Sequence, residues 1–329
     1  MTVKFAINGF GRIGRAVARA YFEGGYPGFE LVAINGMGTS EQDLHLFEYD
    51  SVHGRFNGSC EVKDGNFVIN DQEIVSLHER SPDKLPWRDL EVAVVLECTG
   101  FFNKREGCQR HINSGAQKVI ISSPAKDDDI KTIIYKVNDE ILAKDDAIIS
   151  IGSCTTNCLA PVVKALHDKY NITRGYVTTI HAYTNDQNIA DATHKDPRRS
   201  RAAALSMIPT STGAAKAIGK VITDLEGKLD GCAIRVPTPN VSMIDFTFNT
   251  ERPMSESEIN SLIESATSDM LGYNSKPLVS IDYNHTTQSS VFDSTGTKVI
   301  DQTFARVASW YDNEWSFACR MLDVMKLMF

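Results

Sequence analysis

The sequence predicts an α/β protein: an N-terminal doubly wound parallel sheet, then an α+β domain with a mostly antiparallel sheet. A glycine-rich turn directly follows the first apolar run, and strand-length apolar runs alternate with helix-length stretches through the first 150 residues. Beyond them, strand-like runs such as "GYVTTI", "CAIRVP" and "SMIDFTFN" lose that alternation. We expect domains at 1–152 and 153–315, with a C-terminal helix, 316–329, packing back on the first domain.

The composition is that of an ordinary globular protein, with 329 residues, 42% hydrophobic and 23% charged. A formal charge of -8 argues against sequence-independent binding to nucleic acid, which uses Lys and Arg against phosphate. The start, "MTVKFAINGF", lacks the apolar core of a signal peptide, and no apolar run is long enough to span a membrane. Seven cysteines, an odd number, make a disulfide framework unexpected. The cytoplasm is the expected compartment.

The first strand and helix flank a G-x-G-x-x-G turn. In "VKFAINGFGRIGRAVARAYF" an apolar run, residues 3–7, leads into Gly9, Gly11 and Gly14, and apolar residues then recur at helical spacing. Gly9 permits a tight turn, Gly11 lets backbone approach a pyrophosphate, and Gly14 lets the helix pack on the strand. Since free N–H groups at the helix start attract anions, this context predicts a dinucleotide site; a turn that merely contains glycines is the alternative.

The second strand, 29–35, ends without the acid that usually binds the adenosine ribose. The chain reads Asn35-Gly36, so no carboxylate adjoins this strand end in sequence. Losing the carboxylate removes repulsion of a 2′-phosphate and makes NADP tolerable, although no arginine lies nearby in sequence to bind it.

Three further strands are expected at 92–98, 118–122 and 147–151, with a helix within 103–116. The strand ends "CTGF", with Thr99 and Gly100, and "ISSP", with Ser122, carry small residues that suit close approach of a cofactor. Ordinary turn chemistry explains these residues equally well.

The stretch "SCTTNC" raises the question of metal site, disulfide or nucleophile. It lies between a strand and a helix with an apolar face, so Ser153 is expected to cap the helix and Cys154 to occupy its first turn. Unpaired N–H groups and the helix dipole favour a thiolate there, which predicts a lowered pKa and a nucleophile. A zinc site would need a second pair at finger spacing, and two cysteines in one helix seldom form a disulfide. Cys158 is expected to be buried and structural.

A histidine and several anion-binding groups follow. His181 comes directly after a strand, 176–180, and a neutral imidazole beside a cysteine can accept its proton, although a lone histidine there is more often structural. "PTSTGAA" places hydroxyls ahead of a helix, 214–221, which is a generic phosphate site. Arg199 and Arg235 can neutralise phosphate. For Arg198, Arg199 and Arg201 a solvated basic loop is the alternative.

Several stretches together carry a family resemblance: "INGFGRIGR", "YDSVHGRF", "ISSPAK", "SCTTNCLAP", "HAYTNDQ", "IPTSTGAAKAIGKVI", "RVPTPNVS" and "SWYDNEW". In this order the chain resembles phosphorylating glyceraldehyde-3-phosphate dehydrogenase over essentially its whole length. The resemblance implies a homotetramer of a Rossmann domain plus a catalytic domain, with an S-shaped loop near residues 182–204 bordering a neighbour's cofactor. It implies oxidation of glyceraldehyde 3-phosphate to 1,3-bisphosphoglycerate with NAD(P), through a cysteine thiohemiacetal and thioester, in glycolysis or gluconeogenesis.

The resemblance also implies roles for individual residues. Cys154 would be the nucleophile and His181 its activator. The cofactor would meet Arg12, Ile13, Arg80, Ser122 and Asn313, the last holding the nicotinamide carboxamide. These residues add to those expected from the glycine turn and from the strand ends, namely Asn35, Gly36, Thr99 and Gly100. The attacking phosphate would meet Ser153, Thr155, Thr212 and Gly213. The substrate's own phosphate would meet Thr184, Arg199 and Arg235.

Departures from the family pattern bear on cofactor and substrate. The family's usual acid after Asn35 is Gly36, and Ala192-Thr193 replaces the Leu-Pro of NAD-specific members, so NADP use is predicted beside NAD. "LHERSPDKLPW" and "SIDYNH" resemble the non-phosphorylating erythrose-4-phosphate dehydrogenase branch, but the retained "HAYT" and "TSTGAA" favour the three-carbon substrate. A redox-sensing nucleotide-binding protein is the non-enzymatic alternative.

Overall fold

The computed structural model describes residues 2–329, which form two compact units. The first comprises the chain up to Tyr135, Asp139–Gly152 and Ala318–Phe329, and the second comprises Lys136–Asn138 and Ser153–Phe317. The end of the C-terminal helix therefore belongs to the N-terminal unit. Within the described residues, no helix combines the length and the apolarity that crossing a membrane requires.

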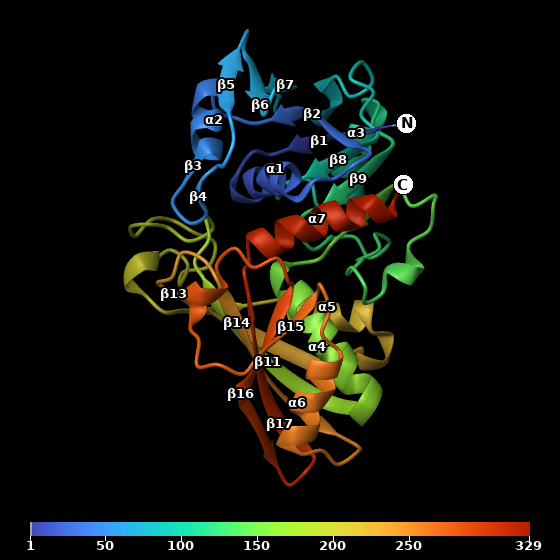
Figure 1. Cartoon of the computed structure of the whole chain (residues 1–329), viewed down its shortest axis with the longest axis vertical. Coiled ribbons are helices and arrows are strands. Elements are labelled where there is room, and N and C mark those ends of the chain that lie inside the picture. Colours follow the sequence, from blue (N-terminus) through green and yellow to red (C-terminus); the bar gives the residue numbers. More distant parts are fainter. Residues whose placement is uncertain (1) are drawn as a thin grey trace. The chain divides into compact units, whose positions relative to one another are not determined.

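The first unit contains an eight-stranded sheet in the order β10-β9-β8-β1-β2-β7-β6-β5 (Figure 1). The strands from β10 to β2 run parallel, as predicted, and three strands that were not predicted extend the sheet: β7, parallel to β2, and the antiparallel β6 and β5. The bounds are β1 Val3–Asn8, β2 Phe29–Asn35, β5 Cys60–Lys63, β6 Asn66–Ile69, β7 Gln72–Leu77, β8 Val94–Glu97, β9 Lys118–Ile121 and β10 Ile148–Ser150; a small sheet pairs β3 Tyr49–Asp50 with β4 Gly54–Arg55.

Four helices accompany this sheet: α1 Arg12–Gly24, α2 Ser40–Glu48, α3 Arg105–Asn113 and α7 Trp315–Leu327. Thr39 closes a capping box at the start of α2 with Gln42, which satisfies two backbone N–H groups there. The helical spacing of Phe317, Met321, Val324, Leu327 and Met328 predicts that one face of α7 joins the core, and Met321 and Val324 are fully buried. The prediction is wrong for Leu327, whose side chain is 42% exposed in the last turn.

A buried polar network links the carboxyl ends of β1, β2 and β8. The Asn35 amide donates to Asn8 Oδ1 at 2.7 Å, and the Asn8 amide donates to Glu97 Oε2 at 2.5 Å. Trp87 Nε1 donates to His111 Nδ1 at 2.9 Å, so His111 Nε2 carries the proton that it shares with Glu97 at 3.1 Å. Because every one of these groups is nearly inaccessible to water, the network fixes three strand ends relative to one another.

Gly14 is a packing requirement of the β1–α1 unit. A Cβ at this position would lie 2.0 Å from the Gly9 carbonyl oxygen, so the helix could not stay in place. We expect Gly14→Ala to lower the free energy of unfolding by about 2–3 kcal/mol, the upper range for overpacking. Gly11→Ala is the control, because a Cβ at Gly11 meets nothing within 4 Å. Guanidinium unfolding of both variants measures the difference; equal stability would contradict the packing argument.

The second unit holds a seven-stranded sheet in the order β12-β13-β11-β14-β17-β16-β15. It is mostly antiparallel, as predicted, but the β11–β13 and β15–β16 pairs are parallel. The strands are β11 Ile172–Ala182, β12 Ile208–Ser211, β13 Leu229–Val236, β14 Ser242–Thr250, β15 Leu271–Asn274, β16 Ser290–Ile300 and β17 Phe304–Tyr311. Helices α4 Cys154–Tyr170, α5 Ala214–Val221 and α6 Glu256–Ser265 pack on it (Figure 1).

The apolar face of α4 anchors this unit's core. Leu159, Val162, Val163 and Leu166 are all fully buried, as the helical spacing predicted. The helix continues through Pro161 to Tyr170. Because α4 is packed on the sheet, its first residue, Cys154, is held in a fixed position.

Candidate active site

The structure brings together the predicted cysteine and histidine. Cys154 is the first residue of α4, and the Ser153 hydroxyl caps the helix by accepting from the Thr156 N–H at 3.0 Å. His181 lies one residue before the end of β11. Cys154 Sγ is 3.5 Å from His181 Nε2, within reach of a hydrogen bond that involves sulfur. A helix start and a strand end thus hold two reactive groups in contact.

The thiol is less acidic than the sequence predicted. Burial raises the pKa of Cys154, although the Arg235 charge and the Thr155 backbone N–H act in the opposite direction. The predicted fall was therefore wrong, because the dense surroundings outweigh the helix terminus. Burial, followed by the positive charge of Arg235, lowers the pKa of His181 to about 3. At neutral pH the pair is a thiol beside a neutral imidazole.

Hydrogen bonding decides which imidazole nitrogen is free to act as a base. His181 Nδ1 lies 2.7 Å from the Ala182 carbonyl oxygen, to which the Arg235 guanidinium also donates at 3.0 Å. We assign the proton to Nδ1, because the carbonyl oxygen can only accept a hydrogen bond, and this leaves Nε2 as an acceptor facing Cys154. The Arg235 Nη1 can only donate and lies 2.6 Å from Nδ1, so it competes with the carbonyl for this nitrogen, and its charge adds to burial in disfavouring an imidazolium.

Tyr311 packs against this pair. It was not identified as a site residue from the sequence. Its hydroxyl lies 2.9 Å from both the Thr155 and the Thr179 hydroxyls, and its ring meets the His181 ring edge-on at a centroid distance of 6.0 Å. All four residues are buried. The Thr155 hydroxyl is thus hydrogen-bonded inside the protein. Of the polar groups of Thr155, which was predicted to bind phosphate, only the backbone N–H is left for that role.

The predicted anion-binding residues differ in how far their polar groups are already engaged. The Arg199 guanidinium forms an ion pair with Asp186 and donates to the Thr210 hydroxyl at 2.9 Å. The Thr184 hydroxyl donates to Gln187 at 3.3 Å. The Arg235 Nε is buried without a hydrogen-bond partner in the described part of the chain, so one cationic donor beside Cys154 is left for a ligand.

The start of α5 offers a second group of donors. The Thr212 hydroxyl accepts from the Ala214 N–H at 3.2 Å, and Gly213 precedes the helix with open space around it. Both residues lie where the sequence predicted them, directly before a helix. A helix N-terminus of this kind favours an anion.

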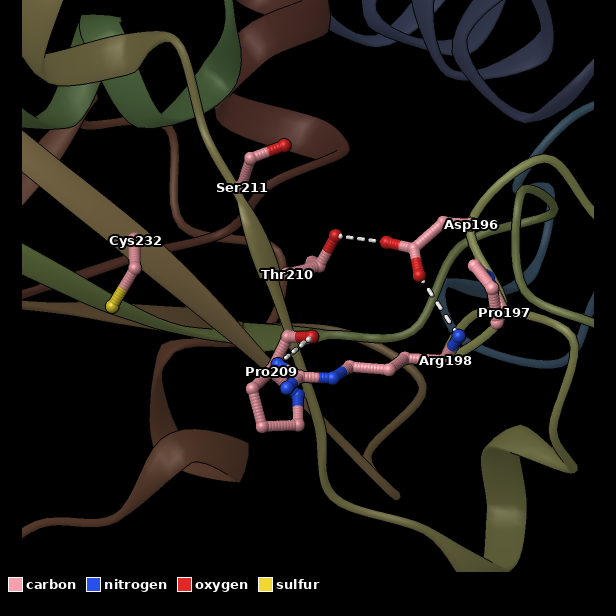
Figure 2. Close-up of a pocket in the computed structure, with 7 residues that line it drawn as sticks. All are labelled: Asp196, Pro197, Arg198, Pro209, Thr210, Ser211 and Cys232. Carbon is pink, nitrogen blue, oxygen red and sulfur yellow. Dashed lines mark hydrogen bonds between the residues drawn. The ribbon is translucent and has the colours of Figure 1, made fainter.

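A cavity of about 470 Å³ near these residues does not include the reactive pair. Figure 2 shows its lining: Asp196, Pro197, Arg198, Pro209, Thr210, Ser211 and Cys232. The Thr210 hydroxyl donates to Asp196 at 2.8 Å, and Arg198 donates to the Pro209 carbonyl at 3.4 Å. The Cys232 thiol points away from Asp196 in the same view. Because Asp196 places a carboxylate in its wall and Arg198 is already hydrogen-bonded to Pro209, this cavity is poorly suited to an anion.

The first unit carries a larger cavity, of about 700 Å³, at the carboxyl ends of its parallel strands. Among the predicted cofactor residues, Gly9, Gly11, Asn35, Gly36, Arg80 and Thr99 line it, whereas Arg12, Ile13, Gly14, Gly100 and Ser122 do not. Gly9 has a φ of +98°, which only glycine adopts without strain, and a Cβ there would lie 2.6 Å from the Thr99 backbone nitrogen. The glycine turn and the cavity thus form one site.

Comparison with known proteins identifies the family. The model of the glyceraldehyde 3-phosphate dehydrogenase NAD binding domain matches residues 3–105, and that of the C-terminal domain matches residues 153–313. The plasmid-encoded glyceraldehyde-3-phosphate dehydrogenase of Cupriavidus necator is 51% identical over 98% of this chain and 97% of its own. The enzymes so named from Xanthobacter flavus and Zymomonas mobilis are 51% and 50% identical, over 100% of this chain and 99% of theirs. The chain belongs to the glyceraldehyde-3-phosphate dehydrogenase family.

A member of this family is an NAD-dependent oxidoreductase, and the first unit fits that cofactor. The cavity has the glycine turn at the start of α1, where backbone N–H groups suit a pyrophosphate, and its volume is that of a typical ligand site. Its wall also contains a buried carboxylate oxygen of Asp43 that has no partner among the described residues. The residues present therefore fit a dinucleotide.

Arg12 forms an ion pair with a neighbouring acid, whereas the family resemblance implied that it contacts the cofactor. Its guanidinium donates to Asp50 at 2.6 and 3.1 Å. Burial raises the pKa of Asp50, but hydrogen bonds from the His53 and Val52 N–H groups and from Arg12 outweigh it and lower the pKa to about 2. The side chain available for a pyrophosphate is thus held on a carboxylate, and the Arg12 contact stays a prediction.

The Arg12–Asp50 pair should stabilise the first unit in a pH-dependent way. An acid whose folded pKa lies below its unfolded value stabilises above that unfolded value and loses the effect as pH falls through the folded pKa. We expect Asp50→Asn to lower the free energy of unfolding by about 2 kcal/mol at pH 7, with the deficit closing between about pH 4 and pH 2. Denaturant unfolding against pH measures it, with exposed Asp71→Asn as control. A deficit that persists at pH 2 would contradict the pairing.

Asn313 is held by a short chain of hydrogen bonds that leads to His181. Ser242, which the sequence analysis did not consider, accepts from the Ala182 N–H at 3.0 Å and donates to Asn313 Oδ1 at 2.8 Å. Because the amide oxygen is used in this way, the NH₂ group of Asn313 is the end left for a ligand. No sequence signal marks Ser242, since it acts across strands β11, β14 and the segment after β17.

Proposed function

We propose that this chain catalyses the phosphorylating oxidation of D-glyceraldehyde 3-phosphate to 1,3-bisphosphoglycerate, with Cys154 as nucleophile and His181 as general base. The observation that carries the proposal is the 3.5 Å contact of Cys154 Sγ with His181 Nε2, the imidazole nitrogen left as an acceptor. It supplies a nucleophile and its base in one contact.

The imidazole moves protons at each step. Nε2 takes the thiol proton as Sγ attacks the aldehyde carbon, and returns it to the oxygen to complete a thiohemiacetal. Bound NAD supplies the acceptor for the hydride. Nε2 then accepts the hydroxyl proton as the carbon is oxidised to a thioester, which is general base catalysis worth roughly 10²–10⁴-fold. Phosphate attacks the thioester carbonyl, and the leaving Cys154 sulfur recovers its proton from His181.

Two anion subsites account for the remaining predicted residues. We assign the substrate's phosphate to Thr184, Arg199 and the free Nε of Arg235. We assign the attacking phosphate to Ser153, the backbone N–H of Thr155, and Thr212 with Gly213 at the start of α5. Asn313, with its NH₂ end free, would bind the carboxamide oxygen of the nicotinamide. These roles rest on the family pattern together with the donors that each residue has left.

Assembly and compartment are part of the same proposal. Ile189, Leu205 and Met207 are 90%, 87% and 75% exposed in the isolated chain, all in or next to the predicted S-shaped loop. Exposed apolar side chains in one segment of the chain favour burial against another copy, and we propose a homotetramer. All seven cysteines are free thiols, which suits a reducing compartment, and we propose the cytoplasm and a place in glycolysis or gluconeogenesis.

Steady-state kinetics with phosphate as the variable tests this function. We expect the rate of NAD reduction with glyceraldehyde 3-phosphate to rise and saturate with inorganic phosphate, as it would for a second substrate. Erythrose 4-phosphate is the comparison substrate, because the non-phosphorylating branch would use it without phosphate. Phosphate-independent turnover would support that branch, and a reactive thiol without turnover of either aldehyde would support a redox sensor.

A further inference from the structure

Helix α2 contributes a carboxylate at the C-terminal end of strand β2. Gly36 follows β2 where an acid was expected, but Asp43 reaches the same place from the first turn of α2. A Cβ built on Gly36 would lie 2.1 Å from Asp43 Oδ2, and one built on Gly38 would lie 2.7 Å from Asp43 Oδ1. The two glycines therefore make room for this side chain, which occupies the space of a residue-36 side chain.

The Asp43 carboxylate is buried and only partly satisfied. The residue is 7% exposed, and its Oδ2 has no hydrogen-bond partner within residues 2–329. Burial raises the pKa of Asp43, while the charges of His78 and Arg15 and the Gly38 N–H hold the rise back. A buried carboxylate oxygen without a donor destabilises the folded chain, so its retention points to a donor supplied by a ligand.

The position of Asp43 indicates which ligand groups it meets. It lines the same cavity of about 700 Å³ as the glycine turn of Gly9 and Gly11. In a dinucleotide site the pyrophosphate lies on that turn and the adenosine ribose lies at the end of the second strand. The groups that reach a carboxylate there are the 2′- and 3′-hydroxyls, which donate hydrogen bonds. A 2′-phosphate at the same place would be repelled.

We propose that Asp43 is the specificity-determining residue for the cofactor: its carboxylate accepts hydrogen bonds from the adenosine ribose hydroxyls of NAD and excludes NADP. This inference rests on the proposed function only for the presence of a dinucleotide. It revises the expectation that Gly36 makes NADP tolerable, since the carboxylate has moved from the strand end to the helix. Arg80, exposed on the same cavity wall, is the group that would instead favour a 2′-phosphate.

Calorimetric titration of the full chain with NAD and with NADP tests the proposal. We expect the wild type to bind NAD at least about 100-fold more tightly than NADP. Asp43→Asn should weaken NAD binding about 10- to 100-fold, the usual effect of losing a hydrogen bond to a charged group, and should narrow the NAD/NADP ratio. Glu41→Gln, which removes an exposed acid from the same helical turn, is the matched control and should change neither affinity.

A relocation variant tests the geometry even if Asp43→Asn folds poorly. Gly36 does not have a positive φ, so its backbone accepts a side chain once Asp43 is gone. We expect the double variant Gly36→Asp with Asp43→Ala to recover the wild-type preference for NAD, whereas Gly36→Asp alone should disrupt binding because two carboxylates would overlap.

Three results would overturn the proposal: equal affinity of the wild type for NAD and NADP, an unchanged ratio in Asp43→Asn, or NADP binding that disappears in Arg80→Ala. Phosphate-dependent oxidation of the aldehyde at saturating NAD, measured on the same variants, keeps the two proposals apart. If the wild type showed no phosphate-dependent oxidation, the proposed reaction would be refuted, and the ratio of NAD to NADP affinity would stand as an independent result.

Discussion

Replacing Cys154 by serine is expected to abolish aldehyde oxidation, with kcat falling on the order of 10⁴-fold or more. A serine hydroxyl has a far higher pKa than a thiol and is a much weaker nucleophile at neutral pH, and it cannot form the thioester that phosphate attacks. Stopped-flow measurement of NADH formation, with NAD affinity measured separately, distinguishes the loss of chemistry from the loss of binding.

Cys158→Ala is the matched control for this variant. Cys158 lies one turn further along α4, is fully buried, and its thiol lies 3.3 Å from the Ser290 hydroxyl. Burial raises the pKa of Cys158 to about 12, so it is inert at neutral pH. We expect the control to keep most of its turnover and lose only stability. Substantial oxidation by Cys154→Ser, or its loss in Cys158→Ala instead, would assign the nucleophile wrongly.

Replacing His181 by asparagine is expected to slow acylation of Cys154 by about 10²–10⁴-fold and to leave NAD affinity unchanged. Asparagine can still donate to the Ala182 carbonyl, so the β11 end should keep its conformation. Without Nε2 the thiol must ionise into solvent, and burial raises the pKa of that thiol. The acylation rate of the variant should therefore rise with pH through the alkaline range.

The wild type should behave differently with pH. Because burial lowers the pKa of His181 to about 3, the imidazole stays in its basic form throughout the neutral range and loses it only as pH falls towards 3. Single-turnover NADH formation between pH 5 and pH 9 should be nearly flat for the wild type and steep for His181→Asn. A wild-type rate that falls with decreasing pH near 6–7, or a variant with weakened NAD binding alone, would contradict the assignment of His181 as base.

Local patterns were sufficient to predict the elements that carry the site. The strand at 29–35 matches β2 residue for residue, and the apolar spacing after Cys154 predicted the buried face of α4. These succeeded because a strand buried in a parallel sheet and a helix packed on one face leave strong periodic signals. The hairpin β5–β6 was missed although the sequence carries a signal for it, since residues 60–63 alternate apolar and polar and Asp64-Gly65 is a typical two-residue hairpin turn.

The unpredicted features depend on contacts between distant segments. Asp43 is seven residues from Gly36 and on another element, so no rule about the end of β2 could find it. Tyr311 and Ser242 act on the reactive pair from β17 and β14, and burial of Cys154 depends on how those strands pack. The helix start alone predicted a lowered thiol pKa, and tertiary burial reversed the sign.

Trapping of the acyl-enzyme tests the account most directly. The enzyme is mixed with NAD and glyceraldehyde 3-phosphate in the absence of inorganic phosphate, quenched in acid and digested, and its cysteine peptides are weighed. We predict one NADH per chain and an acyl adduct on the peptide of Cys154 alone, released when phosphate is added before the quench. Continued NADH formation without phosphate, or an adduct on any other cysteine, would contradict the account.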